Sequence, residues 1–383
     1  MNSLILIGDA RQRLAELPAG SARTCVTSPP YFGLRDYGTA TWNGGDTECD
    51  HLGKPMATKA NINRNCGTGN DVKNATAREF FRETCGKCGA TCIDSQIGLE
   101  ETPDAYVAEM VALFREVWRV LADDGTLWLN LGDSYVADSY VRERGTQAFQ
   151  SGADTANEGW LAADRAESGK ARKNLSWASS AGLKKKDLIG IPWRVALALQ
   201  ADGWYLRSDI IWAKPNPMPE SVTDRPTKSH EYLFLLTKSP RYYYDHEAIK
   251  EPALHPKMKH KSNKKPEGAS VAYIGNPPTN LGRAGTSDNG LRNKRDVWTI
   301  NTKPFKGAHF AVMPEALVEP CVLAGSAEGD TVLDPFTGSG TVAVVANRHG
   351  RNFVGTELNA DYAEIARERI TKDAPMLNKV ETK

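Results

Sequence analysis

The sequence predicts an α/β protein built around a doubly wound, mostly parallel sheet. Short apolar runs that end in turn residues alternate with segments of helical periodicity, an alternation typical of parallel strands joined by helices. Two of the expected strand ends are followed by a polar or glycine-rich turn. Because open α/β sheets bind ligands at the carboxyl ends of strands, we expect the functional site there.

The chain opens with a β-α-β unit. Apolar runs at 3–7 and 24–27 predict buried strands, and each run is followed by turn residues. Between them, 10–17 has leucines at helical spacing, and Pro18 ends the expected helix.

The rest of the chain continues the alternation. Thr102 can cap a helix with Pro103 at its first position, and Asp124-Gly125 is expected to end that helix. Next come a strand, a helix and two further strands, predicted at 126–131, 192–201, 206–212 and 232–237. The last part predicts strand, helix, strand and helix at 331–333, 341–349, 352–356 and 361–371.

Charge and composition limit the class of protein. The 383 residues contain 48 Lys and Arg against 47 Asp and Glu, which excludes a uniformly basic coat protein and an acidic tail protein. Apolar residues make up 40 % and charged residues 25 %, as in ordinary globular proteins. No apolar run is long enough for a membrane span, and the start lacks the features of a signal peptide. We therefore expect a cytoplasmic protein with no membrane partner.

Three segments interrupt the core pattern. Residues 33–98 are rich in Gly, Asn, Thr and Cys and predict an insertion held by something other than an apolar core. Residues 135–186 predict a mobile loop, because they contain few large apolar side chains. Residues 245–298 are polar and basic. The core is expected to consist of two parts, one made of 1–32 and 99–244 and the other of 299–375.

The insertion contains five of the seven cysteines, which indicates metal binding in a reducing compartment. Cys85-x-x-Cys88, with a glycine after each cysteine, is a knuckle that presents two thiolates to one tetrahedral zinc ion. A second pair completes the predicted structural zinc site, whose ligands are Cys49, His51, Cys85 and Cys88. Cys92 or Cys66 could replace the histidine, and exposed thiols without metal are the alternative.

A glycine-rich turn, Asp334-Pro-Phe-Thr-Gly-Ser-Gly-Thr341, lies between a predicted strand and helix. Its glycines let the backbone approach a ligand closely, but it matches neither a phosphate-binding loop nor a full dinucleotide turn. Glu357 ends the next strand, where a carboxylate can accept hydrogen bonds from both hydroxyls of a ribose. Together they indicate an adenosine-bearing ligand. The alternative is a turn kept for packing and an acid that caps a helix.

The tetrapeptide Ser28-Pro29-Pro30-Tyr31 follows the second strand. Two prolines make a stiff loop, whose hydroxyl and carbonyl can accept hydrogen bonds from an exocyclic amine. Tyr31 adds a ring on which a base extruded from a duplex can stack. By itself, such a tetrapeptide is more often only a turn.

Together and in this order, the two motifs resemble those of amino-group DNA methyltransferases with the permuted (beta) arrangement, including phage and prophage members. Segments similar to that family extend over 4–31 and 99–370, and include Gly8-Asp9, 211–216, 225–232 and 309–314. The resemblance implies a Rossmann-like methyltransferase fold with S-adenosylmethionine as the methyl donor. It also implies direct in-line transfer to an amino nitrogen of a base flipped from double-stranded DNA.

The resemblance also assigns residues to the two halves of the site. Ser28, Pro29, Pro30 and Tyr31 would lie at the target base. The donor would be held by Asp9, Phe310, Asp334, Phe336, Gly338, Gly340, Thr341, Glu357 and Asn359.

In the family, serine at the first catalytic position is typical of enzymes that methylate N4 of cytosine, and aspartate of those that methylate N6 of adenine. Ser28 favours cytosine, with adenine as the alternative. An RNA or a protein amide as substrate, and a zinc-containing DNA-binding protein with an inactive core, are further alternatives. Cys321 follows a proline, as does the nucleophile of C5-cytosine enzymes, but it lies in an expected helix and is not predicted to act as one.

Between Glu251 and Phe310 the sequence has eleven Lys and Arg against four Asp and Glu. This local excess suits contact with DNA phosphates, in the region where the family carries target recognition; a solvated basic loop is the alternative. Lys184-Lys185-Lys186 predicts a second contact. A cognate restriction endonuclease is a further expected partner, and the chain is expected to be a monomer or a homodimer.

Overall fold

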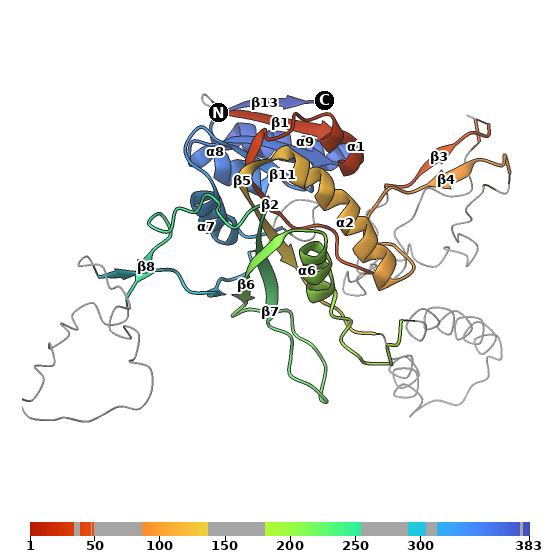
Figure 1. The fold of residues 1–383 in the computed structure, drawn as a ribbon. Coiled ribbons are helices and arrows are strands. Elements are labelled where there is room, and N and C mark those ends of the chain that lie inside the picture. Colours follow the sequence, from red (N-terminus) through yellow and green to blue (C-terminus); the bar gives the residue numbers. More distant parts are fainter. Residues whose placement is uncertain are drawn as a thin grey trace, which may run out of the picture.

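The computed structural model describes residues 1–33, 39–46, 48–49, 85, 87–136, 181–253, 290–303, 312–375 and 378–383. Its centre is a nine-stranded sheet with the order β10-β6-β7-β5-β2-β11-β12-β1-β13 (Figure 1). The strands are β1 (Asn2–Ile7), β2 (Ala22–Thr27), β5 (Leu121–Leu131), β6 (Tyr205–Ala213), β7 (His230–Thr237), β10 (Val297–Thr299), β11 (Thr331–Asp334), β12 (Asn352–Glu357) and β13 (Lys379–Thr382). Only β7 runs antiparallel to its neighbours, β5 and β6. The predicted mostly parallel sheet is thus confirmed.

Helices cover both faces of the sheet (Figure 1). One face packs against α1 (Ala10–Ala15), α2 (Pro103–Val120) and α6 (Ile191–Ala201). The other packs against α7 (Glu315–Gly325), α8 (Thr341–Arg348) and α9 (Ala360–Asp373). The fold is therefore doubly wound, as predicted.

Central strands contribute to both apolar layers, so consecutive residues within them can both be apolar. In β2, Cys25 packs into the layer of α2, whereas Val26 packs into the layer of α7. In β5, Leu127 and Trp128 divide between the two layers in the same way.

The expected start of α2 is correct, but its expected end is wrong. Thr102 Oγ1 accepts a hydrogen bond of 3.1 Å from Ala105 N, and Pro103 is the first helical residue. The helix ends at Val120 rather than at Asp124-Gly125, because Leu121 is extended and pairs with Ala22 of β2. Sheet pairing therefore ends the helix before the turn residues are reached.

Two edge strands escape detection in the sequence, because they are short and lack an apolar run. β10 pairs with β6 at one edge of the sheet, and β13 pairs with β1 at the other. Backbone pairing, including the bond of 2.9 Å from Lys383 N to Ile5 O, places β13 in the sheet.

Two small antiparallel ribbons extend from the core on opposite sides (Figure 1). β3 (Thr41–Asn43) pairs with β4 (Thr91–Ile93) inside the cysteine-rich insertion, and β8 (Glu251–Pro252) pairs with β9 (Leu291–Arg292) inside the basic segment. Most of the expected mobile loop, 137–180, lies outside the described residues. None of the described helices is both long and apolar enough to cross a bilayer.

The order of the strands determines where the two sequence motifs meet. β2 and β11 are parallel neighbours at the centre of the sheet, although about 300 residues separate them. Ser28 follows the carboxyl end of β2, and Asp334 is the last residue of β11. The tetrapeptide and the glycine turn therefore lie side by side.

Candidate active site

A cavity of about 430 Å³ opens at the carboxyl ends of the central strands, a size that suits a small molecule. It unites the ends of β1, β2, β11 and β12 with the start of β7 and the end of β6. Its lining includes Asp9, Ser28, Pro29, Pro30, Tyr31, Asn130, Trp212, Lys214, Glu231, Asp334, Phe336, Gly338, Thr341, Glu357 and Asn359.

Asp334 is a buried carboxyl at the floor of this cavity. Its Oδ1 accepts hydrogen bonds of 2.6 Å from Thr27 Oγ1 and 3.0 Å from Phe336 N. Burial, and to a lesser extent the Glu357 carboxylate, raise the pKa of Asp334 to about 7, against the lowering effect of these two hydrogen bonds. The side chain is therefore poised to ionise near neutral pH, and a cation in the cavity would favour the charged form.

Glu357 lies at the end of β12 beside the glycine turn. Its Oε2 accepts a hydrogen bond of 2.8 Å from Gly338 N, and its Oε1 accepts one of 3.0 Å from Asn359 N. Burial raises its pKa, and the backbone donors oppose that effect. Since a carboxylate has about four acceptor positions, each oxygen keeps capacity for one more donor, such as a hydroxyl.

The remaining residues expected at the donor have different surroundings. Asp9 caps α1 through bonds from Arg11 N and Gln12 N, and Asn359 caps α9, yet both line the cavity. Thr341 Oγ1 accepts a hydrogen bond of 2.8 Å from Arg369.

Gly340 has a positive φ of 76° at the start of α8, and a Cβ there would lie 3.1 Å from Ala366 Cβ. It thus faces α9 rather than the cavity. Phe310 lies outside the described residues, although its near neighbours Val312 and Met313 line the cavity.

The Ser28–Tyr31 loop is fixed by contacts with α2 and with the end of β5. Pro29 is buried, and Tyr106 of α2 donates a hydrogen bond of 2.9 Å to the carbonyl oxygen of Pro30. The Tyr31 ring lies directly on the backbone of Gly132, where an added Cβ would come within 2.5 Å of Tyr31 Cε2. These contacts fix the loop between α2 and the end of β5.

Asn130 of β5 determines how the Ser28 hydroxyl is oriented. Its Nδ2 donates a hydrogen bond of 3.0 Å to the carbonyl oxygen of Tyr232, which can only accept. The amide oxygen must therefore face Ser28, and Ser28 Oγ can donate its proton to Asn130 Oδ1 at 3.3 Å or to Tyr31 OH at 3.4 Å. With its proton engaged there, Ser28 Oγ presents its lone pairs as acceptors.

Tyr31, Glu231 and Lys214 continue this polar network. Tyr31 OH donates to Glu231 Oε2 at 2.9 Å, and Glu231 Oε1 is paired with the ammonium group of Lys214. Burial, followed by the Glu231 carboxylate, raises the pKa of Tyr31 well above its usual value. Tyr31 is therefore a hydrogen-bond donor at all pH values in which the protein would work. Lys214 Nζ also lies 4.2 Å from the centre of the Trp212 ring.

Four residues of this site were not assigned a role from the sequence: Asn130, Trp212, Lys214 and Glu231. Three belong to the segments 211–216 and 225–232, which resemble the family but suggested no function on their own. A polar residue at the end of an apolar strand was the signal that could have indicated Asn130.

The structure brings together three of the predicted metal ligands. The sulfur atoms of Cys49, Cys85 and Cys88 all lie within 4.8 Å of one another. His51 lies outside the described residues, as does Cys66. Cys321 is buried in α7, where it donates to the carbonyl oxygen of Leu317, and burial raises its pKa. It lies outside the cavity wall, in agreement with the expectation that it is no nucleophile.

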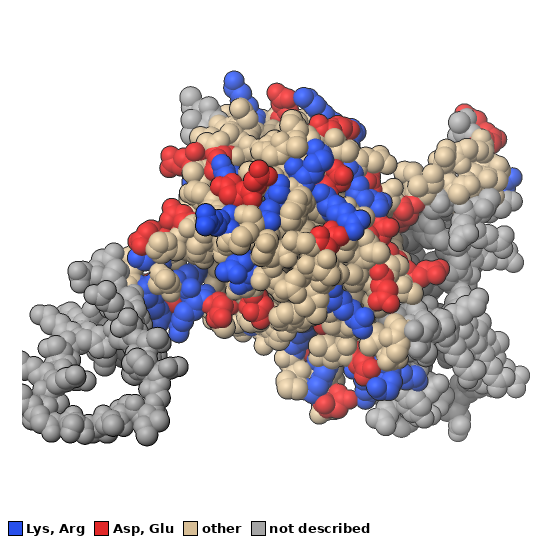
Figure 2. Space-filling view, viewed as in Figure 1, with Lys and Arg blue, Asp and Glu red and all other residues tan. Residues whose placement is uncertain are grey.

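Much of the basic segment also lies outside the described residues. Within its described parts, Arg292 and Arg295 both pair with Glu251, and Lys294 lies over the Trp298 ring. Figure 2 shows basic and acidic side chains interspersed over the face in view. Two of the eleven basic side chains thus share one of the four acidic ones, Glu251.

The chain is similar to proteins of a known family. A family model described as DNA methylase (N6_N4_Mtase) matches residues 22–368. Type II methyltransferase M.Cfr9I of Citrobacter freundii is 42 % identical over 363 residues, which are 95 % of this chain and 86 % of that protein. Type II methyltransferase M.SmaI of Serratia marcescens is 42 % identical over 368 residues, with coverages of 96 % and 90 %.

Solved structures show the same fold. The PvuII DNA methyltransferase (cytosine-N4-specific) has a TM-score of 0.51 at 14 % identity, covering 98 % of this chain and 92 % of that one. The Thermus thermophilus protein TTHA0409, solved with S-adenosyl-L-methionine, has a TM-score of 0.50 at 21 % identity, with full coverage of both chains. With the family match over most of its length and its close relatives, the chain belongs to the DNA methylase family of N6 and N4 methyltransferases.

Proposed function

We propose that the protein transfers a methyl group from S-adenosyl-L-methionine to the N4 amine of cytosine in double-stranded DNA. The observation that supports this most directly is the fixed orientation of Ser28. Because Asn130 Oδ1 and Tyr31 OH are both acceptors for its proton, Ser28 Oγ offers lone pairs to a donor in the cavity. An exocyclic amine, with two N–H groups, is such a donor.

The target half of the cavity would activate this amine by hydrogen bonding. The lone pair of an exocyclic amine is delocalised into the base. Hydrogen bonds from its protons to Ser28 Oγ and to the carbonyl oxygen of Pro29 would localise electron density on nitrogen. Tyr31 and Trp212 supply aromatic surface beside these acceptors. The reaction then requires in-line positioning and no covalent enzyme intermediate.

The donor half of the cavity fits S-adenosylmethionine by its chemistry. Glu357 has acceptor capacity for ribose hydroxyls, and Asp334 provides a carboxyl that a cationic ligand would ionise. When bound there, S-adenosylmethionine would supply the electrophilic methyl group. Asp9, Phe336 and Gly338 complete the proposed wall for it, with Phe310 and Thr341 proposed alongside.

DNA binding and a partner nuclease are parts of the same proposal. The basic residues of 245–298 would contact phosphates during target recognition. Since similar proteins are named type II methyltransferases, we further propose that a cognate restriction endonuclease accompanies this protein.

Ser28 favours cytosine over adenine as the target. The test is to incubate the protein with isotopically labelled S-adenosylmethionine and unmethylated duplex DNA, digest the DNA and identify the labelled nucleoside. N4-methylcytosine is expected. N6-methyladenine would show that adenine is the target instead of cytosine. Label found only at C5 of cytosine would overturn the mechanism.

Two control reactions address the other classes of protein. RNA and a protein extract should receive no label under the same conditions. If no DNA is labelled, calorimetry with S-adenosylhomocysteine distinguishes the remaining cases: failure to bind would indicate a DNA-binding module without a donor site.

A further inference from the structure

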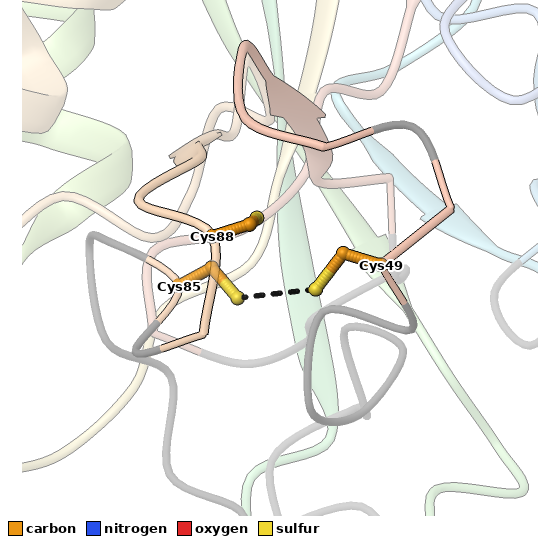
Figure 3. A group of neighbouring side chains, drawn as sticks. All are labelled: Cys49, Cys85 and Cys88. Carbon is orange, nitrogen blue, oxygen red and sulfur yellow. Dashed lines mark hydrogen bonds between the residues drawn. The ribbon is translucent and has the colours of Figure 1, made fainter.

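Three cysteines from two distant parts of the insertion converge at the end of the β3–β4 ribbon. Cys49 follows the turn after β3, whereas Cys85 and Cys88 precede β4. Figure 3 shows the side chains of Cys49 and Cys85 pointing toward each other, with Cys88 beside them. Cys49 and Cys85 are 36 positions apart in the sequence, so this convergence is a tertiary feature.

The distances fit a shared metal ion better than a disulfide. Cys49 Sγ and Cys85 Sγ are 3.9 Å apart. Two thiolates on one tetrahedral zinc ion, each at about 2.3 Å from the metal, are separated by about 3.8 Å. A disulfide would require about 2.05 Å. Cys88 Sγ lies within 4.8 Å of both other sulfur atoms, so one ion can reach all three with small adjustments.

The backbone around Cys85 and Cys88 has the form of a metal-binding knuckle. Cys85 N donates to Ala90 O at 2.7 Å, and Gly89 N donates back to Cys85 O at 3.0 Å. This tight turn brings the two cysteines of the Cys-x-x-Cys sequence to the same side.

Gly45 brings the other side of the ribbon against this turn. A Cβ on Gly45 would lie 2.7 Å from Cys88 Sγ and 2.8 Å from Ala90 Cβ, and its φ of +74° favours glycine as well. The turn after β3, which leads to Cys49, therefore packs directly on the knuckle.

Few of the described side chains are buried at this end of the ribbon. Of the described side chains from Thr39 to Asp94, only Cys85 and Ala90 are buried. β3 and β4 are three residues each, and a short two-stranded ribbon without an apolar core is marginal in water. A metal cross-link supplies the stabilisation that such a segment lacks.

The ribbon is also connected to the active site. The chain from β4 passes through Ser95, Gln96 and Ile97, which line the cavity beside the Ser28–Tyr31 loop. Gly33 N donates to Gly98 O at 2.8 Å and closes the base of the insertion at the same place. A well-ordered ribbon therefore helps to position the cavity wall formed by the residues that follow β4.

We propose that Cys49, Cys85 and Cys88 bind one structural zinc ion that fixes the β3–β4 ribbon. The three thiolates are soft ligands suited to zinc, and binding releases their protons to the solvent without any change of oxidation state. His51, the fourth ligand expected from the sequence, lies outside the described residues, and the three thiols support the site without it.

The first experiment measures zinc in the protein purified under reducing conditions without chelators. We expect about one zinc ion per chain, and its loss from the variants C85S and C88S. The matched control is C321S, because Cys321 is buried elsewhere and a serine can keep its hydrogen bond to Leu317 O. Zinc retained by C85S at the wild-type level, or wild-type protein without zinc, would overturn the proposal.

A second experiment uses the wild-type chain and so does not depend on the folding of variants. The metal-free protein is titrated with Co²⁺ alone, and its absorption spectrum is recorded. Thiolate-to-cobalt charge transfer with intense visible bands is expected for tetrahedral thiolate coordination, and the weak spectrum of six oxygen ligands would contradict it. Removing zinc should also speed proteolytic cleavage in the β3–β4 ribbon, at 39–46 and 87–94. None of these measurements depends on methyl transfer. A negative result would therefore reject the zinc site without contradicting the proposed enzyme activity.

Discussion

Thr27 Oγ1 donates a hydrogen bond of 2.6 Å to Asp334 Oδ1, between residues 307 positions apart in the sequence. Both side chains are buried, one at the end of β2 and the other at the end of β11. Thr27 directly precedes Ser28, and Asp334 begins the glycine turn. This single bond therefore joins the two motifs on which the proposed reaction depends.

Loss of the Thr27 hydroxyl should destabilise the protein in a pH-dependent manner. T27V keeps the shape of the side chain but removes a donor that favours the ionised form of Asp334. We expect the free energy of unfolding to fall by about 1.5–3 kcal/mol at high pH, the usual value for a hydrogen bond to a charged group, and by less when Asp334 is protonated. Urea unfolding on either side of neutrality measures this. T27S keeps the donor, so its stability should follow the same pH dependence as the wild type, lowered by about 1 kcal/mol at every pH for the lost buried methyl group. An equal loss at both pH values in T27V would show that packing is responsible.

Asp334 itself should produce a fall in stability as the pH rises. Burial raises its pKa in the folded protein to about 7, above the ordinary value of 3.8. The folded state therefore binds more protons than the unfolded state between these values, and stability decreases with pH across this window and levels off above it. The contribution is at most about 4 kcal/mol.

The variant D334N should lack this contribution, because its amide oxygen can still accept the bonds from Thr27 and Phe336 without a charge. Its stability relative to the wild type should therefore increase from about pH 5 to about pH 8. Denaturant unfolding without ligand at several pH values is the measurement, and parallel curves would refute the assignment. Affinity for S-adenosylmethionine should fall in the same variant.

Replacing Ser28 should lower kcat without changing the affinity for the methyl donor. S28A removes the proposed acceptor for the amine, and we expect kcat to fall by about 100-fold or more, as for the removal of a single preorganised hydrogen-bonding group. The dissociation constant of S-adenosylhomocysteine should be unchanged. S239A is a suitable control, because Ser239 lies beyond the opposite end of β7 and donates to Arg241 O. A parallel loss of ligand affinity in S28A would contradict its proposed role.

Asn130 should act through Ser28 as a positioning residue. In N130A the Ser28 hydroxyl would keep only the more distant acceptor, Tyr31 OH at 3.4 Å, and its orientation would be less fixed, so kcat should fall while ligand affinity remains. A double-mutant cycle tests the coupling, because the variant with both substitutions should turn over no more slowly than S28A alone. Additive losses would show that Asn130 contributes independently. Its effect on stability is measured in parallel, since Asn130 is buried.

Most of the core could be predicted from the sequence because its signals are local. Apolar runs and capping residues indicated β1, β2, α2 and the strands and helices of the last part. The errors occurred where pairing between distant segments determines the end of an element. Leu121, for example, is extended and pairs with Ala22, so α2 ends before it. The short edge strands β10 and β13 escaped for the same reason.

The sequence by itself determined the fold class, the family and the two motifs, since strand periodicity, turn chemistry and motif order are contained in short segments. Only the tertiary structure decided which groups meet: Thr27 with Asp334, Ser28 with Asn130, Tyr31 with Glu231, and Cys49 with Cys85. Each of these contacts joins segments that the sheet order or a chain reversal brings together. Hydrogen-bond direction, burial and the resulting pKa values depend on all neighbours in space, and no local pattern encodes them.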